Sequence, residues 1–297
     1  MPFAALPGRR PGTVLLEDVA VAVVPHGPFL LDRLTSPPPV RAGRGTMLLA
    51  GAVDYGPAGA WRPLDGTRAE VAHVRDLAAR CGAAEVRLRL GADATAAGVA
   101  ADLPGARFAH LATHGFYRDG GPARSAAAVR NPLLASGLVL AGANAPGPDR
   151  GVLTAEAIAA HRLEGMDLAV LSACETSLGD VVAGEGVFGL QRAFHAAGCW
   201  TVVASLWRVD DTATAELMHG FYRHLWEAVP PRPPIQALRA AQLAMLRGLH
   251  PGSGVGRDVA LRPVPAPPPP AVVRPAGSDP PTRTHLWAAF VVSGAPH

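Results

Sequence analysis

Several short and almost uninterrupted apolar runs constrain the fold of this chain more than any other feature. Four of them are "TMLLAGAVD" (46–54), "ARFAHLATHG" (106–115), "MDLAVLSAC" (166–174) and "CWTVVASLW" (199–207). Strands that are apolar throughout, rather than at alternate positions, are buried on both faces, as in parallel sheets. The chain therefore needs helices on both sides of one central sheet.

Segments with helical periodicity separate these runs. In 67–82, apolar residues recur at three- and four-residue spacing; we expect Thr67 to cap this helix, with Glu70 three residues later, and Gly82 to end it. Further helices are predicted at 93–105, 153–165, 184–198, 210–229 and 235–249. Further strands are predicted at 84–91, 136–142 and 285–294, with one or two more within 14–34. The alternation predicts an α/β fold, an α/β/α sandwich with a mostly parallel central sheet.

The predicted domain organisation follows from length and proline content. The 297 residues suit one large domain or two small ones, and the continuous alternation favours one domain over 13–294 after a tail at 1–12. In 263–281, nine of nineteen residues are proline, which favours an extended, solvated conformation. We therefore expect a disordered insertion at about 251–284, between the last helix and the last strand.

Composition argues against several classes of function. The net charge is +3 and every basic residue is Arg, but the arginines are scattered, so no direct nucleic-acid ligand is expected. Cys81, Cys174 and Cys199 are widely spaced and form no CxxC, which argues against a disulfide framework or a zinc site and fits a reducing cytoplasm. The sequence has neither a signal-peptide pattern at its N-terminus nor an apolar stretch long enough to cross a membrane, so no membrane is expected as a partner.

Two reactive side chains follow two of the apolar runs. His114 lies near the end of 106–115, and Cys174 ends 166–174. The carboxyl ends of parallel strands meet at one edge of a sheet, where the ligands of such folds bind. An imidazole there can take the proton of a thiol, whose thiolate can attack a carbonyl, and the backbone N–H groups of Gly115 and Cys174 would stabilise the oxyanion.

Each of these residues also has an ordinary structural interpretation. A cysteine that ends a buried strand is often a small core residue, which is the simplest interpretation of Cys174 alone. A histidine between Thr and Gly is often a hydrogen-bonded turn residue, which is the simplest interpretation of His114 alone. The pairing of the two on strands that end at the same edge favours catalysis.

Five stretches follow one another in an order that is typical of one family: "ARFAHLATHGF", "MDLAVLSACETSLG", "GEGVFGLQRAFHAAGCWTVVASLWRVDDTATAELMHGFYRHLWE", "QALRAAQLAML" and "HLWAAFVVSG". Together they resemble the CHAT domain, a group of caspase- and separase-related cysteine peptidases found with TPR repeats in many bacterial proteins. The resemblance covers roughly residues 12–294. It implies a caspase-like fold, with His114 as the general base, Cys174 as the nucleophile, and no metal or organic cofactor.

The stretch "SLWRVDD" (205–211) also resembles the "WxVxD" stretch of separase. There the last Asp lies in the pocket for a basic P1 side chain, and the matching residue here is Asp211. A competing interpretation is that Asp210 and Asp211 begin a helix, where carboxylates stabilise the N-terminus. One residue of the pair could fill each role.

The leading hypothesis is a cysteine endopeptidase that cleaves protein substrates after a basic P1 residue. No TPR repeat precedes the CHAT-like region in this sequence, so we expect regulation by a TPR-containing or other partner, supplied by another chain or by a missing upstream segment. The alternative is a non-catalytic CHAT-type scaffold or signalling module. A nucleotide-binding domain is disfavoured because no GxGxxG follows the first strand and a chain without Lys cannot form a GxxxxGK[ST] loop.

Overall fold

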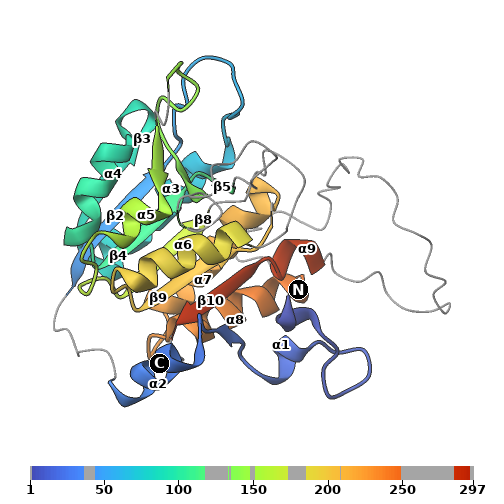
Figure 1. Ribbon diagram of the computed structural model, residues 1–297. Coiled ribbons are helices and arrows are strands. Elements are labelled where there is room, and N and C mark those ends of the chain that lie inside the picture. Colours follow the sequence, from blue (N-terminus) through green and yellow to red (C-terminus); the bar gives the residue numbers. More distant parts are fainter. Residues whose placement is uncertain are drawn as a thin grey trace, which may run out of the picture.

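A seven-stranded sheet forms the centre of the protein in the computed structural model (Figure 1). The structure describes residues 2–36, 44–117, 133, 135–147, 151–172, 185–207, 209–248 and 284–294. The strands of the sheet are β1 (Ala22–Val23), β2 (Gly45–Gly51), β3 (Ala83–Leu90), β4 (Phe108–Ala112), β8 (Leu168–Ser172), β9 (Thr201–Ser205) and β10 (Phe290–Gly294). Their order is β1-β10-β9-β8-β4-β2-β3, and only the β10–β9 pair is antiparallel. The predicted mostly parallel sheet is confirmed.

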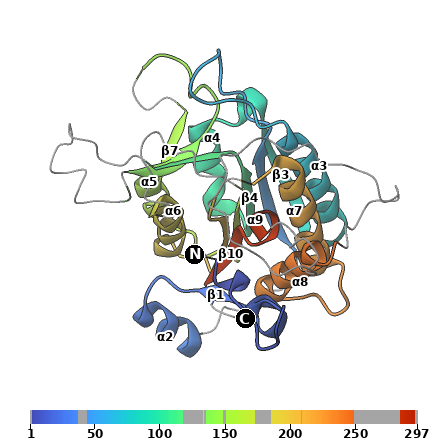
Figure 2. The same ribbon diagram turned by 90° about the vertical axis from the view of Figure 1, so that its right-hand side faces the viewer.

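Helices cover both faces of this sheet (Figures 1 and 2). One face carries α3 (Gly66–Leu77), α7 (Asp211–Trp226) and α8 (Pro234–Leu246), and the other carries α4 (Ala96–Asp102), α5 (Ala155–Ala159) and α6 (Glu185–Ala196). Along β2, Met47 and Leu49 pack in the first layer, whereas Leu48 and Ala50 pack in the second. All four side chains are fully buried, which explains why the strand is apolar at every position. The predicted α/β/α sandwich is confirmed.

A second, three-stranded antiparallel sheet lies beside the carboxyl end of β4. It consists of β5 (His114–Tyr117), β6 (Ser136–Val139) and β7 (Val152–Thr154), in that order. The single strand predicted over 106–115 is therefore wrong, because the chain leaves the central sheet at Thr113. The hydroxyl of Thr113 donates to the carbonyl of Val139, which ties this turn to β6 rather than to the central sheet.

The N-terminal segment differs from the strands predicted within 14–34. It contains α1 (Leu15–Asp18), the two-residue β1 and α2 (Gly27–Thr35), after the short helix η1 (Phe3–Ala5). The side chain of His26 caps α2 by accepting the Phe29 N–H at 3.1 Å, and a proline in the first turn suits a helix start. The sequence "PHGP" (25–28), which lies within the region predicted as strands, thus begins a helix.

The start of α3 also differs from its prediction. The helix begins at Gly66, and the hydroxyl of Thr67 donates to the Leu64 carbonyl and accepts the Ala52 N–H instead of capping the helix. Glu70 is not part of a capping box, because it is buried against His110 of β4. The helix does end at the predicted place, since the π-helical turn η2 (Ala78–Gly82) leads directly into β3.

The remaining short helices are η3 (Gly91–Asp93), η4 (Leu103–Gly105) and α9 (Thr284–Trp287). The last predicted strand, at 285–294, consists of α9 followed by β10. The proline-rich insertion predicted at about 251–284 lies outside the described residues, apart from Thr284, and stays a prediction. Among the described residues, no helix has the length and apolar character needed to cross a membrane.

Candidate active site

The strands that precede His114 and Cys174 are neighbours in the sheet. β4 and β8 run parallel, and their last residues, Ala112 and Ser172, are paired across the ladder. His114 follows Ala112 by two residues, and Cys174 follows Ser172 by two residues in the sequence. Cys174 itself lies outside the described residues. The two chain segments that carry the predicted dyad therefore leave the central sheet at the same edge.

The imidazole of His114 is held by the loop between β2 and α3. Its Nε2 lies 2.7 Å from the carbonyl oxygen of Arg62, and the residue is only 5% exposed. Because a carbonyl can only accept, Nε2 must carry a proton, and the neutral ring then has its lone pair on Nδ1. The rings of Tyr55 and Trp61 lie beside the imidazole, with centroids 5.0 Å and 5.5 Å away.

A directed chain of hydrogen bonds anchors the backbone next to His114. The Thr113 hydroxyl has a single proton, which it donates to Val139, so the Tyr55 hydroxyl must donate to Thr113 Oγ1 at 2.9 Å. The Tyr55 oxygen also accepts the backbone N–H of His114. Burial raises the pKa of Tyr55, and the nearby charge of Asp211 raises it further, so the phenol keeps its proton.

Gly115, the predicted oxyanion donor beside Cys174, lies within β5 and is paired with Leu138 of β6. The three-stranded sheet therefore fixes the backbone of Gly115 directly after His114. Since the predicted second donor is the N–H of Cys174, outside the described residues, the oxyanion site stays a prediction.

The two aspartates at the start of α7 have different contacts. Oδ1 of Asp210 accepts the N–H groups of Thr212 at 3.0 Å and Ala213 at 3.2 Å, so Asp210 is the N-cap. Asp211 is half-buried, and its Oδ2 lies 3.4 Å from the Gly66 N–H at the start of α3. Because its charge acts on Tyr55, Asp211 lies toward the same edge as His114. Its role in substrate binding stays a prediction.

The two described cysteines differ in exposure. Cys199 is fully buried and donates to the Thr201 carbonyl at 3.3 Å, and burial raises the pKa of its thiol to about 12. Cys81 is half-buried and lies in the turn η2. A thiol with so high a pKa is a poor nucleophile near neutral pH, so Cys199 is a core residue. Within the described part of the chain, no three His, Cys, Asp or Glu side chains gather as metal ligands would.

Sequence reasoning missed the aromatic residues around His114. Tyr55 and Trp61 lie in "DYGPAGAWRP" (54–63), a segment rich in glycine and proline that has no periodicity. Aromatic residues make up only 5% of the chain, so two of them in one loop indicate that the loop packs against something. The sequence does not say against what.

Comparisons with known proteins place the chain in a family. No curated protein matches it. The crystal structure of the Arg-specific cysteine proteinase gingipain R is similar over 85% of this chain, with 11% sequence identity and a TM-score of 0.49. The matched region covers 46% of the gingipain chain, so this chain spans about half the length of that proteinase. The CHAT domain family matches residues 1–295, and the chain therefore belongs to the CHAT domain family.

Proposed function

We propose that this CHAT domain is a cysteine endopeptidase in which Cys174 is the nucleophile and His114 the general base. The observation that carries the proposal is the pairing of Ala112 with Ser172, because it brings the ends of β4 and β8 side by side just before the two residues. The contact between His114 Nε2 and Arg62 supports it further, since it leaves Nδ1 as the nitrogen that can take a proton.

The proposed reaction has two steps. In the first, Nδ1 of His114 takes the thiol proton of Cys174, and the thiolate attacks the carbonyl carbon of the scissile peptide bond. The N–H groups of Gly115 and Cys174 stabilise the resulting oxyanion, and His114 returns the proton to the leaving amine, which leaves a thioester. In the second, His114 takes a proton from water, whose oxygen attacks the thioester carbon; the C–S bond breaks, the carboxylic acid is released, and the Cys174 thiolate regains the proton from His114. This sequence of steps needs neither a metal nor an organic cofactor.

Asp211 is proposed to bind a basic P1 side chain. Its carboxylate is half-buried and lies toward the His114 edge, and a carboxylate holds Arg or Lys by charge-assisted hydrogen bonds. Asp210 already caps α7, so the helix start does not depend on Asp211 for its cap.

Alkylation of the full-length protein tests the dyad. We expect iodoacetamide at pH 7.5 to modify Cys174 well before half-buried Cys81, with Cys199 protected by burial and its raised pKa. His114→Ala should slow the Cys174 reaction by roughly 10-fold, because a thiol with an unperturbed pKa of about 8.5 is only about one-tenth thiolate at pH 7.5. Peptide mapping by mass spectrometry measures each cysteine in the same sample, so Cys81 is an internal reference.

His161→Ala is the matched control, because this histidine precedes the amino end of β8 rather than following its carboxyl end. It should leave the Cys174 rate unchanged. If Cys174 reacted no faster than Cys81, or if His114→Ala kept the parent rate, the site would not be catalytic and the non-catalytic scaffold would be the better hypothesis.

A peptide library with varied P1 residues tests Asp211. We expect the parent protein to prefer Arg and Lys, and Asp211→Asn to weaken that preference by roughly 10- to 100-fold, as for the loss of a hydrogen bond to a charged group. Asp210→Asn is the control, because asparagine also caps helices well. An unchanged P1 profile in Asp211→Asn would remove Asp211 from the pocket without affecting the dyad.

We further propose that the protein acts in the reducing environment of the cytoplasm. As a separase-like peptidase, it would take part in bacterial signalling by cleaving protein substrates. The odd number of widely spaced cysteines supports the reducing setting. A TPR-containing or other regulatory protein would supply the activating signal.

A further inference from the structure

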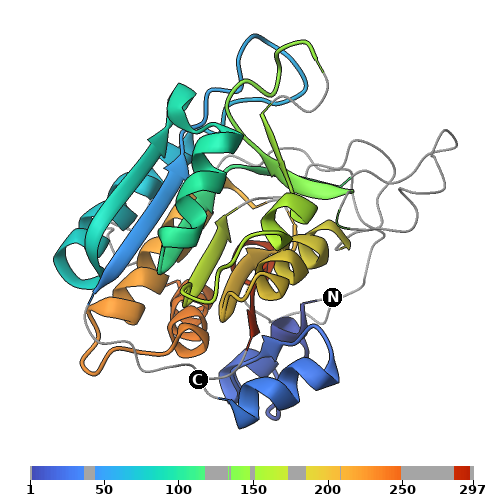
Figure 3. The ribbon, with the colours of Figure 1, turned by 60° about the vertical axis from the view of Figure 1, so that its left-hand side comes forward.

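Asn144 connects two loops that lie side by side at the carboxyl edge of the central sheet (Figure 3). It lies after β6, in 140–147, and its side chain contacts the loop 52–65 between β2 and α3. Oδ1 accepts the backbone N–H of Trp61 at 3.0 Å, and Nδ2 donates to the backbone carbonyl of Trp61 at 2.8 Å. One amide thus holds both polar backbone groups of a single residue, and those groups dictate which end is Oδ1.

The backbone of Asn144 holds the second aromatic residue beside His114. Its N–H donates to the carbonyl of Tyr55 at 2.8 Å. Asn144 therefore fixes the main chain of both Tyr55 and Trp61, whose rings flank the imidazole. The approach is close, because a Cβ on Gly59 would lie 2.6 Å from Oδ1 of Asn144. Glycine at 59 leaves room for this contact.

The contact between Asn144 and Trp61 affects His114 through the peptide bond that joins Trp61 to Arg62. The carbonyl that accepts from Nε2 of His114 belongs to Arg62, the residue directly after Trp61. Arg62 is itself exposed, so its carbonyl depends on the neighbouring backbone for its position. With the N–H and C=O of Trp61 fixed, only the torsions of Arg62 remain to move that carbonyl.

We propose that Asn144 is the positioning residue of the general base, which keeps His114 in its Nε2–H tautomer with Nδ1 ready to accept a proton. The effect on reactivity rests on the proposed function of His114 and Cys174. The effect on the tautomer does not, because it follows from the contact with Arg62 alone. Asn144 touches neither the imidazole nor a substrate in this role and acts only through the loop.

Two measurements on the full-length protein test this role. Nitrogen NMR of histidine side chains reads the tautomer directly, and the signal of His114 among the eleven histidines is assigned by its loss in His114→Ala. The second measurement is the alkylation rate of Cys174. In Asn144→Ala we expect a mixture of His114 tautomers and an alkylation of Cys174 that is several-fold slower, with the roughly 10-fold loss in His114→Ala as its upper limit.

Asn144→Asp has the same shape and keeps the acceptor for the Trp61 N–H, but sets a second oxygen against the Trp61 carbonyl. We expect Asn144→Asp to change the His114 tautomer and the Cys174 alkylation rate in the same direction as Asn144→Ala. It therefore replaces the alanine variant if that variant folds poorly. Gln242→Ala is the matched control. Nε2 of Gln242, in α8, donates to the backbone carbonyls of Trp287 and Phe290 at 2.9 Å. Like Asn144→Ala, this substitution removes a side-chain amide that binds backbone groups, but it does so far from His114 in the sequence, between α8 and β10. It should leave both readouts unchanged.

A single Nε2–H tautomer and the parent rate in both Asn144 variants would overturn the proposal. So would a Gln242→Ala variant that changed His114 equally, because the effect would then be general loosening. Failure of the proposed function looks different: Cys174 alkylation would not respond to His114→Ala, while the tautomer of His114 would still report on Asn144.

Discussion

Burial sets the protonation state of His195 in α6. This residue is 7% exposed, with Nδ1 lying 3.0 Å from the Cys199 carbonyl and Nε2 lying 2.9 Å from the Ser293 hydroxyl. Burial lowers its pKa to about 4; the hydrogen bond to the Cys199 carbonyl offsets part of this lowering, and the charge of Arg33 adds a smaller lowering. The neutral ring donates from Nδ1 to Cys199, so Nε2 accepts from Ser293 and joins α6 to β10.

The pKa of His195 gives a pH dependence of folding stability with a definite sign. In the unfolded chain a histidine takes up a proton near pH 6.5, whereas folded His195 stays neutral down to about 4. Its contribution to the free energy of unfolding is therefore complete above pH 6.5 and is lost as the pH falls to about 4. The loss should be about 3 kcal/mol over this window.

Urea unfolding at several pH values between 7.5 and 4 measures this loss. His195→Gln, which cannot titrate, should flatten the dependence in the window from pH 6.5 to 4 even if it lowers stability overall. The same slope in parent and variant would show that His195 does not cause the pH dependence.

Among the elements, three are joined in the core by a buried polar network. Glu70 of α3, His110 of β4 and Tyr222 of α7 are 2%, 0% and 0% exposed. His110 Nε2 lies 3.1 Å from the Glu70 carboxylate, and its Nδ1 lies 3.2 Å from the Tyr222 hydroxyl. Burial raises the pKa of Tyr222 well above its usual range, and the charge of Glu70 adds to this. The network holds α3 and α7 in register on β4, beneath the edge where His114 and Asp211 lie.

Removing one member of this network should destabilise the protein more than removing two. His110→Leu leaves the Glu70 carboxylate buried without its partner, and we expect it to lower the free energy of unfolding by about 3–5 kcal/mol. The double variant Glu70→Leu/His110→Leu should recover at least half of that loss. Urea unfolding of the two variants and the Glu70→Leu single variant completes the cycle. Equal or greater destabilisation in the double variant would show that the pair does not act as a unit.

The elements could be predicted where burial on two faces or one helical stripe dominates the sequence. β2, β8 and β9 and the helices α3, α7 and α8 follow directly from such patterns. These patterns gave wrong predictions where a hydrogen bond of one side chain determines the local structure. Thr113 redirects the chain into a second sheet, and His26 caps a helix in a segment interpreted as strands. In both cases a hydrogen bond replaces the expected periodicity.

The candidate site was predictable only in part for a similar reason. The dyad was predicted from two reactive residues at strand ends, a local signal. The hydrogen bonds between Asn144 and Trp61 join residues 83 positions apart in loops without periodicity, so the sequence does not reveal them. Likewise, nothing near "PLDG" indicates that Gly66 lies against Asp211, 145 positions later.

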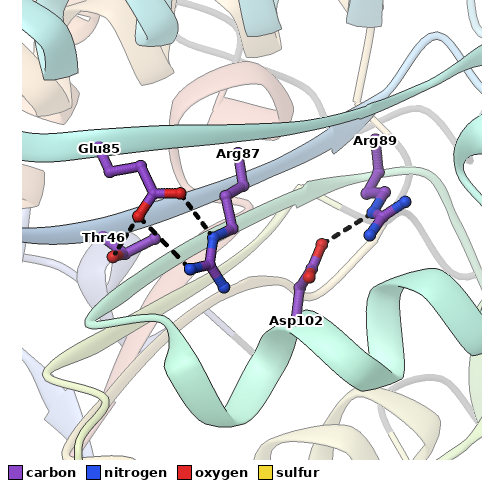
Figure 4. A network of polar contacts seen from close by, with 5 residues as sticks. All are labelled: Thr46, Glu85, Arg87, Arg89 and Asp102. Carbon is purple, nitrogen blue, oxygen red and sulfur yellow. Dashed lines mark hydrogen bonds and ion pairs between the residues drawn. The ribbon is translucent and has the colours of Figure 1, made fainter.

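For the molecule as a whole, the central sheet has an edge at β3. On the face that carries α4, the side chains of β3 are charged: Arg87 pairs with Glu85, which also accepts from Thr46, and Arg89 pairs with Asp102 of α4 (Figure 4). An edge strand has backbone groups that can pair with another chain, and charged side chains discourage such pairing. Leu88, at 39% exposed, is the apolar residue on β3 that most needs this protection.

Removing these charges should promote self-association. We expect the triple variant Glu85→Thr/Arg87→Val/Arg89→Val to sediment as concentration-dependent oligomers, because apolar, β-branched edges pair readily. The control Arg75→Val/Asp76→Thr removes an exposed ion pair that belongs to the helix α3 and not to the edge strand, and should behave like the parent. If the triple variant sedimented like the parent protein at all concentrations, the charges on β3 would not protect the edge.

The far side of the sheet joins strands that lie far apart in the sequence. In β10, Val292 pairs with Ala22 of β1 on one side and with Val203 of β9 on the other. About 270 residues separate β1 from this neighbour, so a nascent chain contains β1 long before it contains β10. Until β10 has been synthesised and has paired with β9, β1 therefore has no strand with which to pair.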